Sequence, residues 1–421
     1  MSNLVTLIAV DVELSSRWSV GGVVTDESKA RLPIIRDPRT DRPWIPGASI
    51  AGSLRHHLAD QAEAWLGALP GGREETTGNV DRKPSRLAVL GGLVAETEVD
   101  VVTSTAVDTA RGAAAGRTLR SAEVAGPTAA TLVFEHAGPH DEELLQSLSA
   151  WTPVFGRGRS TGLGRGVVQR VRVVTVDLAT EEGLAWWLGG RHDWFASGSA
   201  PDELVSRDPI SGVSPSTSEL VQDFLVAEPV RVGTGSTTMA ASRNHLDILM
   251  LGEAALIPGS SWKGVFRHRS LVILEALGAS REQANGVCAW LFGSLEGGRG
   301  VLGFSDSLVE KPRIVDRAHI AIDRFTGGVK DGALFNTRAL DRDQRIRLCI
   351  RWESGGFPGG VTTLLRHVMW DLHEGMISVG GMGSRGYGWL RFANKSPQRP
   401  GPVDLAGLLR EASTTKLEAA S

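Results

Sequence analysis

The spacing of hydrophobic and polar residues predicts a series of short strands and helices that occurs twice along the chain. Apolar and polar positions alternate over residues 4–14, which indicates a first β-strand. Turn residues in DPRTDRP, between residues 32–35 and 44–45, indicate a hairpin, and a helix is expected from Pro46-Gly47 to about residue 66. The rest of this first part is expected to hold strands at 99–107 and 130–136, a helix at 141–150 and a final strand after a glycine-rich run.

The second part of the chain repeats this order of elements. A strand is expected at 220–232, a shorter hairpin at 248–256 and a helix at 260–277. The order β-hairpin-α-β-β-α-β is typical of ferredoxin-like or RRM-like units with insertions, which present their sheets and loops to RNA. The predicted fold class is therefore α+β, with two such domains in tandem. Strands at 318–323 and 345–352, a helix at 360–374 and a last strand complete the second series.

Direct self-comparison finds the same repeat in the residues themselves. Three segments of the first part match three segments of the second part, in the same order and at a nearly constant offset. In the first pair, seven of thirteen positions are identical, which predicts an internal duplication. The pairs are IPGASIAGSLRHH (45–57) and IPGSSWKGVFRHR (257–269), AVD (106–108) and AID (321–323), and GRSTGLGRGVV (158–168) and GMGSRGYGWLRF (381–392).

The repeat sets the expected domain boundaries. Residues 1–180 are expected to form the first domain and residues 218–395 the second. Residues 181–217 indicate a helix followed by a linker rich in Ser, Pro and Gly, and residues 396–421 a tail. A chain of 421 residues is long enough for two domains, each with a core of its own.

Charge and cysteine content narrow the class of protein. The net charge of -3 and the pI of about 6.4 argue against a general polyanion binder, but they leave room for a local basic groove. Cys288 and Cys349 each stand in an apolar run and outside any CxxC pair, so we expect buried free thiols and a reducing, cytoplasmic compartment. The N-terminus lacks the basic start of a signal peptide, and no apolar stretch approaches the ~20 residues of a membrane span.

The duplicated IPG segments place small residues at the start of a helix, where free N–H groups and the helix dipole favour an anion. In the second copy, Lys263 and Arg267 are four residues apart and share one face near that end. The first copy keeps Arg55 but has Ala51 in place of the lysine. These residues predict a phosphate site, whereas the alternative is that Pro-Gly only turns the chain and Ser caps the helix. The serines concerned are Ser49, Ser260 and Ser261.

The glycine-rich run that closes each copy allows a phosphate chain to approach the backbone closely. Each run leads into a strand and not into a helix, which excludes a dinucleotide-binding GxGxxG turn. Interleaved arginines favour a nucleic-acid backbone, although a strained turn before a strand is the simpler alternative. The predicted RNA contacts in these runs are Arg157, Arg159, Gly162, Gly383, Ser384, Arg385 and Gly386.

Acidic residues are the candidates for any catalysis, because the sequence contains no HExxH or P-loop pattern. Asp247 stands directly before an apolar stretch, with His245 beside it. A carboxylate there could hold a divalent cation or take part in proton transfer from a ribose 2′-hydroxyl. The alternative is an aspartate at a strand edge that accepts a bond from a local N–H group.

Taken together, these motifs resemble the RAMP superfamily of CRISPR-associated proteins, and most closely the repeated backbone subunit of type III effector complexes. The two copies together cover most of the chain, and the fusion of subunits resembles the type III-D branch. The first copy carries a degraded version of the pattern. In the second copy the resemblance is carried by Asp247, residues 257–261, Lys263, Gly264, Arg267, residues 321–324, 326–327 and 331–336, and residues 383–388.

The resemblance implies an antiviral ribonucleoprotein whose subunits line a guide CRISPR RNA, with other RAMP subunits and large subunits as partners. A β-hairpin thumb from each subunit would insert into the guide–target duplex, and Arg324 would contact RNA. Asp247 matches the aspartate that cleaves target RNA with a divalent cation, Mg²⁺ or Mn²⁺. The first copy has Arg31 at the aligned position, with Asp26 and Glu27 as its nearest acids, so it is expected to bind guide RNA without cutting.

Three other functions remain open at this point. The chain could be a guide-binding subunit without catalysis. It could also be a guide-processing endoribonuclease of the same superfamily, which would rely on His245 or His56. A small-molecule enzyme on a ferredoxin-like scaffold is disfavoured, because no polar cluster stands within an apolar frame of the sequence.

Overall fold

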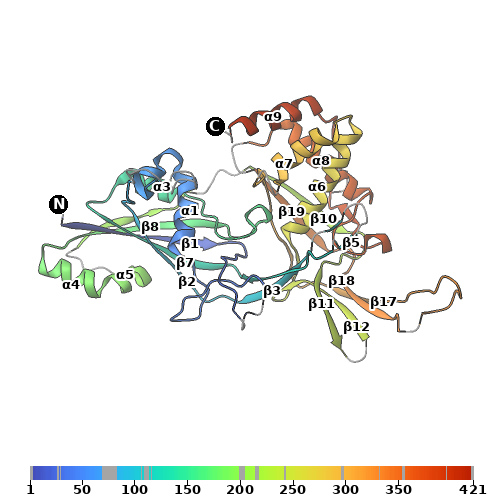
Figure 1. Ribbon diagram of the computed structural model, residues 1–421, viewed down its shortest axis with the longest axis horizontal. Coiled ribbons are helices and arrows are strands. Elements are labelled where there is room, and N and C mark those ends of the chain that lie inside the picture. The colour runs from blue at the N-terminus through green and yellow to red at the C-terminus, as the bar shows by residue number, and fades with distance from the viewer. Residues whose placement is uncertain are drawn as a thin grey trace, which may run out of the picture. The chain divides into compact units, whose positions relative to one another are not determined.

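The computed structural model divides the chain into two compact units (Figure 1). Unit 1 comprises Met1–Val101, Ala122–Arg159 and Leu163–Pro215, and unit 2 comprises Val102–Ser121, Ser160–Gly162 and Ser216–Ser421. The structure describes residues 3–25, 28, 30–68, 83–105, 107–108, 113–114, 116–198, 204–213, 218–240, 243–294, 298–330, 332–352, 356–394 and 396–418, without the side chains of 107–108, 113–114, 205–207, 234–240, 243–246 and 414–418. Asp26, Glu27, Asp331 and the side chain of His245 therefore lie outside the described part of the chain.

Unit 1 is built on a five-stranded antiparallel sheet with helices packed against it. Its elements are β1 Leu4–Leu14, β2 Ala88–Val94, β7 Thr128–Ala137, β8 Gly166–Asp177, β9 Val205–Ser211, α1 Gly47–Leu58, α2 Ala62–Leu66, α3 Glu142–Ser149, α4 Glu181–Gly189 and α5 Arg191–Ser197. The strand order is β2-β7-β1-β8-β9, with β1 in the centre. Even-numbered residues of β1 from Ile8 to Leu14 pack in the cluster that holds α1 and α3, whereas Leu7 and Ala9 pack with Trp194 of α5. The alternating side chains of β1 are thus buried on both faces.

Two segments of unit 1 differ from the sequence prediction. The expected linker contains β9, which pairs with β8 at the edge of the sheet. Pro209 fits there because an edge strand can do without one ladder N–H group. The hairpin expected around DPRTDRP closes through the Arg36–Pro43 bridge and through hydrogen bonds from the Trp44 N–H to the Ile35 carbonyl and from the Asp37 N–H to the Arg42 carbonyl, but it forms no continuous pair of strands. Proline lacks the N–H group that a continuous ladder requires, which accounts for the difference.

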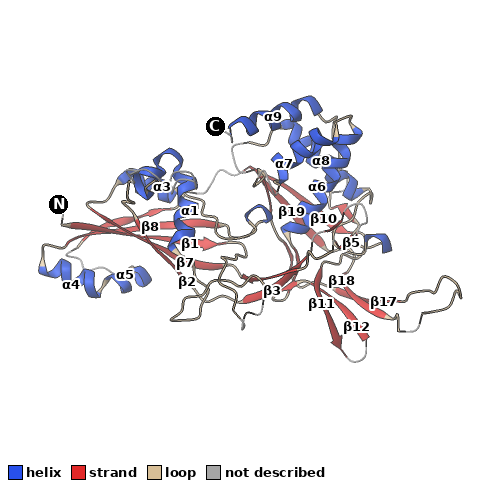
Figure 2. Ribbon diagram, in the orientation of Figure 1, coloured by secondary structure: helices blue, strands red, loops and turns tan. Residues whose placement is uncertain are grey.

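Unit 2 contains a four-stranded antiparallel sheet covered by helices (Figure 2). Its elements are β10 Ser218–Val226, β15 Leu302–Phe304, β19 Arg345–Trp352, β20 Leu390–Phe392, α6 Gly259–Ala276, α7 Arg281–Phe292, α8 Gly359–His373 and α9 Leu405–Glu418. Alternate residues of β19 enter the core, where Leu348 and Ile350 join Trp262 and Phe266 of α6. A capping box between Ser280 and Gln283 fixes the start of α7. The tail predicted after residue 395 thus holds a helix, α9.

A second four-stranded sheet of unit 2 carries the candidate site. It consists of β11 Gly233–Ala240, β12 Arg243–Ile248, β18 Phe335–Leu340 and β17 Ile314–His319, in this order. The pair β12–β18 is parallel, and the other neighbouring strands are antiparallel. Smaller pairings complete the fold: β13 Met250–Leu251, β14 Ala254–Ile257 and β16 Ser307–Val309 in one sheet, β3 Val99–Ser104 with β6 Arg120–Ala125, and β4 Val107–Asp108 with β5 Ala113–Ala114.

These helices and antiparallel sheets confirm the predicted α+β fold class. The strand expected at 318–323 ends at His319, and residues 320–323 belong to a turn region. Cys288 is buried and Cys349 half-buried, and both are free thiols, so the expectation of full burial is wrong for Cys349. Burial raises the pKa of the Cys288 thiol to about 11. Among the described residues, no helix is both long and apolar enough to cross a membrane.

Candidate functional site

Asp247 lies on β12, beside the cations of the neighbouring strand. Its Oδ1 is 3.5 Å from Nη1 of Arg338 on β18, and about a third of the Asp247 side chain is exposed. Arg338 Nε lies 3.7 Å from Asp316 Oδ1 on β17. The parallel register of β12 and β18 and the antiparallel register of β17 and β18 bring the three side chains together. One arginine is therefore shared between two carboxylates on a partly exposed sheet.

The oxygen ligands at this place suit a divalent cation only with help from a bound molecule. Carboxylate oxygens are the ligands that Mg²⁺ prefers, and this ion is usually held by one or two carboxylates together with water and phosphate oxygens. No group of three or more His, Cys, Asp or Glu side chains with metal-site geometry occurs among the described residues. Asp247, with Asp316 nearby, fits a site in which water and phosphate oxygens complete the coordination. The two carboxylates do not form a closed cage of protein ligands.

A buried tyrosine, Tyr387, connects the glycine-rich loop to the same sheet. Its hydroxyl lies 2.8 Å from His319 Nε2 on β17 and 2.9 Å from Thr337 Oγ1 on β18. We call Tyr387, His319 and Thr337 the tyrosine cluster. The imidazole stacks on the ring of Phe335 at a centroid distance of 5.1 Å, and the Arg385 guanidinium lies 5.2 Å from the same ring. Burial and the charges of Arg385 and Arg317 lower the pKa of His319, which keeps the ring neutral at pH 7.

Arg231 is a half-buried cation in the segment that joins β10 to β11. Burial lowers the pKa of Arg231, while Tyr387 and Asp247 both act to raise it, so both are within electrostatic reach of the guanidinium. The backbone carbonyl of Arg231 accepts the Gly381 N–H at 2.8 Å. A Cβ at Gly380 would lie 2.4 Å from that carbonyl oxygen, and φ there is +87°, so only glycine fits this contact. Sequence reasoning missed Arg231, because nothing near it in the chain marks it.

The glycine-rich loop is the strained turn of the simpler interpretation, and its contact with RNA stays a prediction. Met382 and Gly388 both have left-handed φ values, and a Cβ added at Gly388 would lie 2.3 Å from the Val379 carbonyl oxygen. The turn also leaves Gly383–Arg385 exposed in a single 3₁₀ turn. Predicted contacts Gly383, Ser384, Arg385 and Gly386 thus lie together at the surface, close to the tyrosine cluster.

Lys263 lies in a separate basic cluster on α6. Its Nζ donates to Ser160 Oγ at 2.7 Å, and Ser160 belongs to unit 2, as part of a segment, Ser160–Gly162, that is flanked in sequence by residues of unit 1. Burial, together with Arg267 and Arg299, lowers the Lys263 pKa to about 8. Gly162 also belongs to unit 2, where a Cβ would lie 2.5 Å from the Phe304 carbonyl oxygen. The positive charges of this cluster repel one another, and a bound anion would relieve that repulsion.

The start of α6 is not the open anion site that the sequence predicted. The Gly259 N–H donates to Asp306 Oδ1 at 2.8 Å. The Asp306 carboxylate therefore already occupies the positive, N-terminal end of the α6 dipole. Pro46 and Pro258 are the N-cap residues of α1 and α6, and neither helix has a side-chain cap. The serine cap considered as the alternative is therefore wrong as well. Ser49, Ser260 and Ser261 remain partly or fully exposed.

The duplicated arginines hold the ends of helices. Arg55 Nη2 donates to the carbonyls of Leu66 and Gly67 at 2.7 and 2.8 Å, at the end of α2. Arg267 Nη1 donates to the carbonyl of Gly293, at the end of α7. These are carbonyls that a helix leaves without an internal partner. Both arginines thus have the same structural partner in the two copies, and their contact with RNA stays a prediction.

The arginines of the first glycine-rich run also contact backbone. Arg157 Nη2 lies 2.8 Å from the carbonyl of Pro33, and burial lowers the Arg157 pKa. Arg159 Nε lies 3.2 Å from the Gly156 carbonyl, with most of its side chain exposed. Arg157 therefore serves the local fold of unit 1, whereas Arg159 leaves a cation at the surface.

Arg324 lies in an exposed loop that Asp323 holds in shape. Asp323 Oδ1 accepts the N–H groups of Phe325 and Thr326 at 2.9 and 3.0 Å, and these bonds lower its pKa. The loop presents Phe325, which is 90% exposed, and Ile322, which is 67% exposed. A structured loop with an uncovered aromatic tip is suited to contact a partner.

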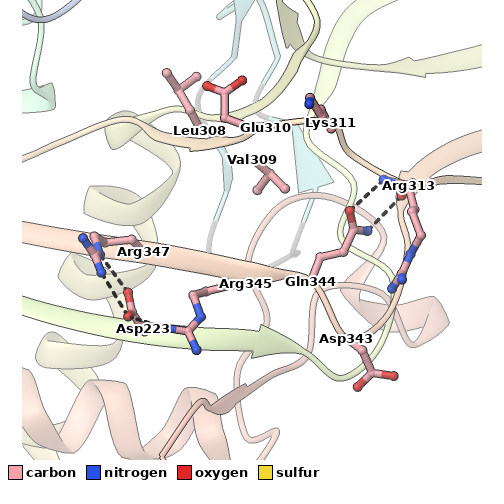
Figure 3. A pocket seen from close by; sticks show the side chains of 10 residues that line it. All are labelled: Asp223, Leu308, Val309, Glu310, Lys311, Arg313, Asp343, Gln344, Arg345 and Arg347. Carbon is pink, nitrogen blue, oxygen red and sulfur yellow. Dashed lines mark hydrogen bonds and ion pairs between the residues drawn. The ribbon is translucent and has the colours of Figure 1, made fainter.

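A hollow of about 680 Å³ lies elsewhere on unit 2, at the ends of β10 and β19 (Figure 3). Asp223 accepts from Arg345 at 3.1 Å and from Arg347 at 2.8 Å, and Arg347 is the main cause of the lowered Asp223 pKa. The alternation of arginine and apolar residues along β19 could have revealed this surface in the sequence, but we did not predict it. The hollow is lined by Asp223, Leu308, Val309, Glu310, Lys311, Arg313, Asp343, Gln344, Arg345 and Arg347.

Comparison with known proteins finds similarity to one family in part of the chain. A sequence model of the RAMP superfamily matches residues 225–391, which contain Asp247, Lys263 and Tyr387. This segment is similar to the RAMP superfamily. The curated proteins contain no match to the chain. Among the solved structures that match is a chain in the cryo-EM structure of the type III-B Cmr-beta bound to cognate target RNA, with 13% identity and a TM-score of 0.32. That match covers 42% of this chain and 59% of the other, so this chain spans little more than half of that protein's length.

The matched residues contain the parts of the prediction that belong to the second copy. Asp247 on β12 pairs with Arg338 on β18, whereas Thr337 and His319 of the tyrosine cluster belong to the alternate face of the same sheet. Lys263 and Arg267 lie on α6. The first copy lies outside the matched residues. Its equivalence to the second copy stays a prediction, based on the sequence repeat and on the matching roles of Arg55 and Arg267.

Proposed function

We propose that this protein is a subunit of a type III CRISPR ribonucleoprotein that binds guide RNA and cleaves complementary target RNA at Asp247. The observation that carries the proposal is a partly exposed carboxylate, paired with Arg338, inside the segment that the RAMP superfamily model matches. The proposed partners are the CRISPR RNA, a complementary target RNA, and further RAMP and large subunits. Unit 1 would bind guide RNA without cutting, because Arg31 stands where the second copy has Asp247.

Each surface would have its own task in this proposal. Lys263 and Arg385 supply cations for the RNA backbone, where charge dominates affinity. The exposed Phe325 and Ile322 would insert into the guide–target duplex and displace a base pair. Unstacking a base frees the adjacent backbone to bring the 2′-hydroxyl in line with the phosphate. Asp247 would hold a Mg²⁺ or Mn²⁺ ion, which when bound would neutralise charge on the phosphate.

A non-catalytic guide-binding subunit is the second candidate, and one observation favours it. The ion pair between Asp247 and Arg338 is a role that an aspartate can have in a strand without any chemistry. In that case the carboxylate would only join β12 to β18, and cleavage by the complex would not depend on it.

Purification of the protein from its native host, with its partners, tests the proposal. The sample should contain a discrete set of small RNAs that share one repeat-derived sequence. The complex should cut an RNA complementary to the guide, in the presence of Mg²⁺, and leave a non-complementary RNA of equal length intact. Absence of any bound RNA in a folded sample would contradict the proposed function.

A further inference from the structure

The two glycine-rich runs contain the same turn. We call Ser160–Gly162 the first turn and Ser384–Gly386 the second turn, which stand at equivalent positions of the sequence repeat. Each lies at the end of a single 3₁₀ turn and closes on a glycine with a left-handed φ, +84° at Gly162 and +80° at Gly386. Because the backbones match, the group that packs on one turn indicates what can pack on the other.

The first turn belongs to unit 2, where it packs on the start of α6. Ser160 Oγ accepts a hydrogen bond from Lys263 Nζ at 2.7 Å. A Cβ at Gly259, the first residue of α6, would lie 2.5 Å from the Thr161 carbonyl oxygen, so only glycine allows this approach. The partner of the first turn is therefore a helix that starts with glycine and carries a lysine one turn later.

The second turn has no such cover in the described part of the chain. A Cβ at Gly162 would lie 2.5 Å from the Phe304 carbonyl oxygen, whereas a Cβ at Gly386 would meet no atom within 4 Å. Ser384 is exposed, and no described residue forms a hydrogen bond with its hydroxyl. The second turn thus presents the acceptor and the glycine that the first turn uses for contact, without an occupant among the described residues.

The surface beside the second turn is acidic and aromatic. A hollow of about 260 Å³ is lined there by Gly386, by the carboxylates of Glu228 and Glu374, and by Trp389, which is 42% exposed. Arg342 already binds Glu228, but no described cation lies within 4.0 Å of the Glu374 carboxylate. An exposed carboxylate and an indole ring suit an ammonium group, and the carboxylates repel a phosphate group.

We propose that the second turn is a docking element for another protein chain, and that it receives the start of a lysine-bearing helix as the first turn receives α6. Ser384 accepts the lysine ammonium, and Glu374 balances its charge. The contact is heterologous, because the two surfaces differ. A second copy of this chain does not supply the helix through α1, which has Ala51 where α6 has Lys263. This inference rests on the proposed function, for which it names the surface that holds a further protein subunit.

Photo-crosslinking in the complex purified from the native host tests the inference. The probe is p-benzoylphenylalanine in place of Met376, a side chain that is 64% exposed and whose chain neighbours line the hollow. The product should join this chain to a peptide of a different protein, with a lysine at the start of a helix. The same probe in place of Leu277, 46% exposed at the end of α6, is the matched control and should not give this product.

Other crosslinking results would overturn the inference. A product with RNA would show that a nucleic acid covers the second turn. A product with a second copy of this chain would show that the occupant is not a different protein. The absence of any product from the probe at Met376 would leave the hollow uncovered in the assembled complex and would also overturn the inference.

Two variants then measure the contact with the crosslinked subunit. Ser384→Ala should lower the affinity for that subunit by about tenfold, the effect of one lost hydrogen bond to a charged group. Glu374→Lys, which places like charges together, should release the subunit. Ser413→Ala, at an exposed serine of α9, is the matched control and should leave the affinity unchanged. Biolayer interferometry with the full-length protein measures all three.

The failure of the inference differs from that of the proposed function. Undiminished affinity in both Ser384→Ala and Glu374→Lys would overturn the inference, and a complex that still contains guide RNA would leave the proposed function standing. A folded protein purified without any bound RNA would contradict the proposed function and remove the basis of the inference.

Discussion

Asp247 and Arg338 face each other across two parallel strands, with Oδ1 and Nη1 3.5 Å apart. Both side chains are a third or more exposed, and Arg338 retains Asp316 as a second partner. An ion pair of this kind contributes only about 0–1 kcal/mol to stability. The proposed catalytic carboxylate can thus be removed without loss of the fold, which makes its chemistry testable.

We therefore predict that Asp247→Asn lowers the free energy of unfolding by less than about 1 kcal/mol. The isosteric amide keeps the volume and can still accept from Arg338. Urea unfolding of the two proteins, followed by circular dichroism, measures the difference. A loss of several kcal/mol would mean that Asp247 is structural and that reduced cleavage in this variant carries no mechanistic meaning.

RNA affinity should depend on pH through Lys263. Its pKa of about 8 lies below the 10.5 of an ordinary lysine, so the ammonium loses its proton as the pH rises through 8. Binding to a phosphate backbone should then weaken between pH 7 and 9. Fluorescence anisotropy over this range measures the effect. Lys263→Arg, which stays charged, should flatten the profile, and an unchanged profile would show that Lys263 does not contact RNA.

The duplicated arginines should affect stability more than RNA binding. Arg55→Ala and Arg267→Ala each leave helix-terminal carbonyls without a partner, at a cost of about 1–3 kcal/mol. Thermal unfolding should show a similar loss for the two variants, because the contacts are equivalent. RNA affinity of the folded fraction should stay within about threefold of the parent protein, a difference below 1 kcal/mol. Variants that stay stable but no longer bind RNA would instead support the interpretation from sequence, in which both arginines contact RNA.

Phe325 should matter for the duplex and not for the fold. The side chain is 90% exposed, so Phe325→Ala should leave stability unchanged. In the assembled complex it should reduce base displacement, which 2-aminopurine fluorescence in the target strand reports. Leu188→Ala on α4, at another exposed apolar residue (66%), is the matched control. Equal fluorescence for Phe325→Ala and the parent complex would exclude a wedge at this position.

Local sequence patterns were sufficient to predict the helices and strands that have a strong hydrophobic periodicity. The alternation in β1, the Pro-Gly starts of α1 and α6, and the order of helices and strands all follow from spacing along the chain. The edge strand β9 was missed because Pro209 and its charged neighbours are typical of a linker, and only its pairing with β8 makes it a strand. Edge position depends on tertiary structure, which a local pattern does not contain.

The candidate site was only partly predictable for a similar reason. Asp247 and the exposed turn at Gly383–Arg385 were found because motifs mark them. Arg231, His319 and Thr337 were missed because they come from separate segments that meet only when β17, β18 and the glycine-rich loop assemble. The helix-end contacts of Arg55 and Arg267 were also missed, because the sequence shows that a charge is repeated but not which carbonyl receives it, and the RNA contact of these arginines stays a prediction.

Cleavage of a guide-complementary RNA by complexes that differ only at Asp247 tests the central claim most directly. Complexes assembled with Asp247→Asn should retain guide and target RNA, and lose the product cut at the position of unit 2. Asp343→Asn, an exposed carboxylate paired with Arg391, is the control and should retain that product. An unchanged product pattern in the Asp247→Asn complex would contradict catalysis at this residue and leave the protein as a guide-binding subunit.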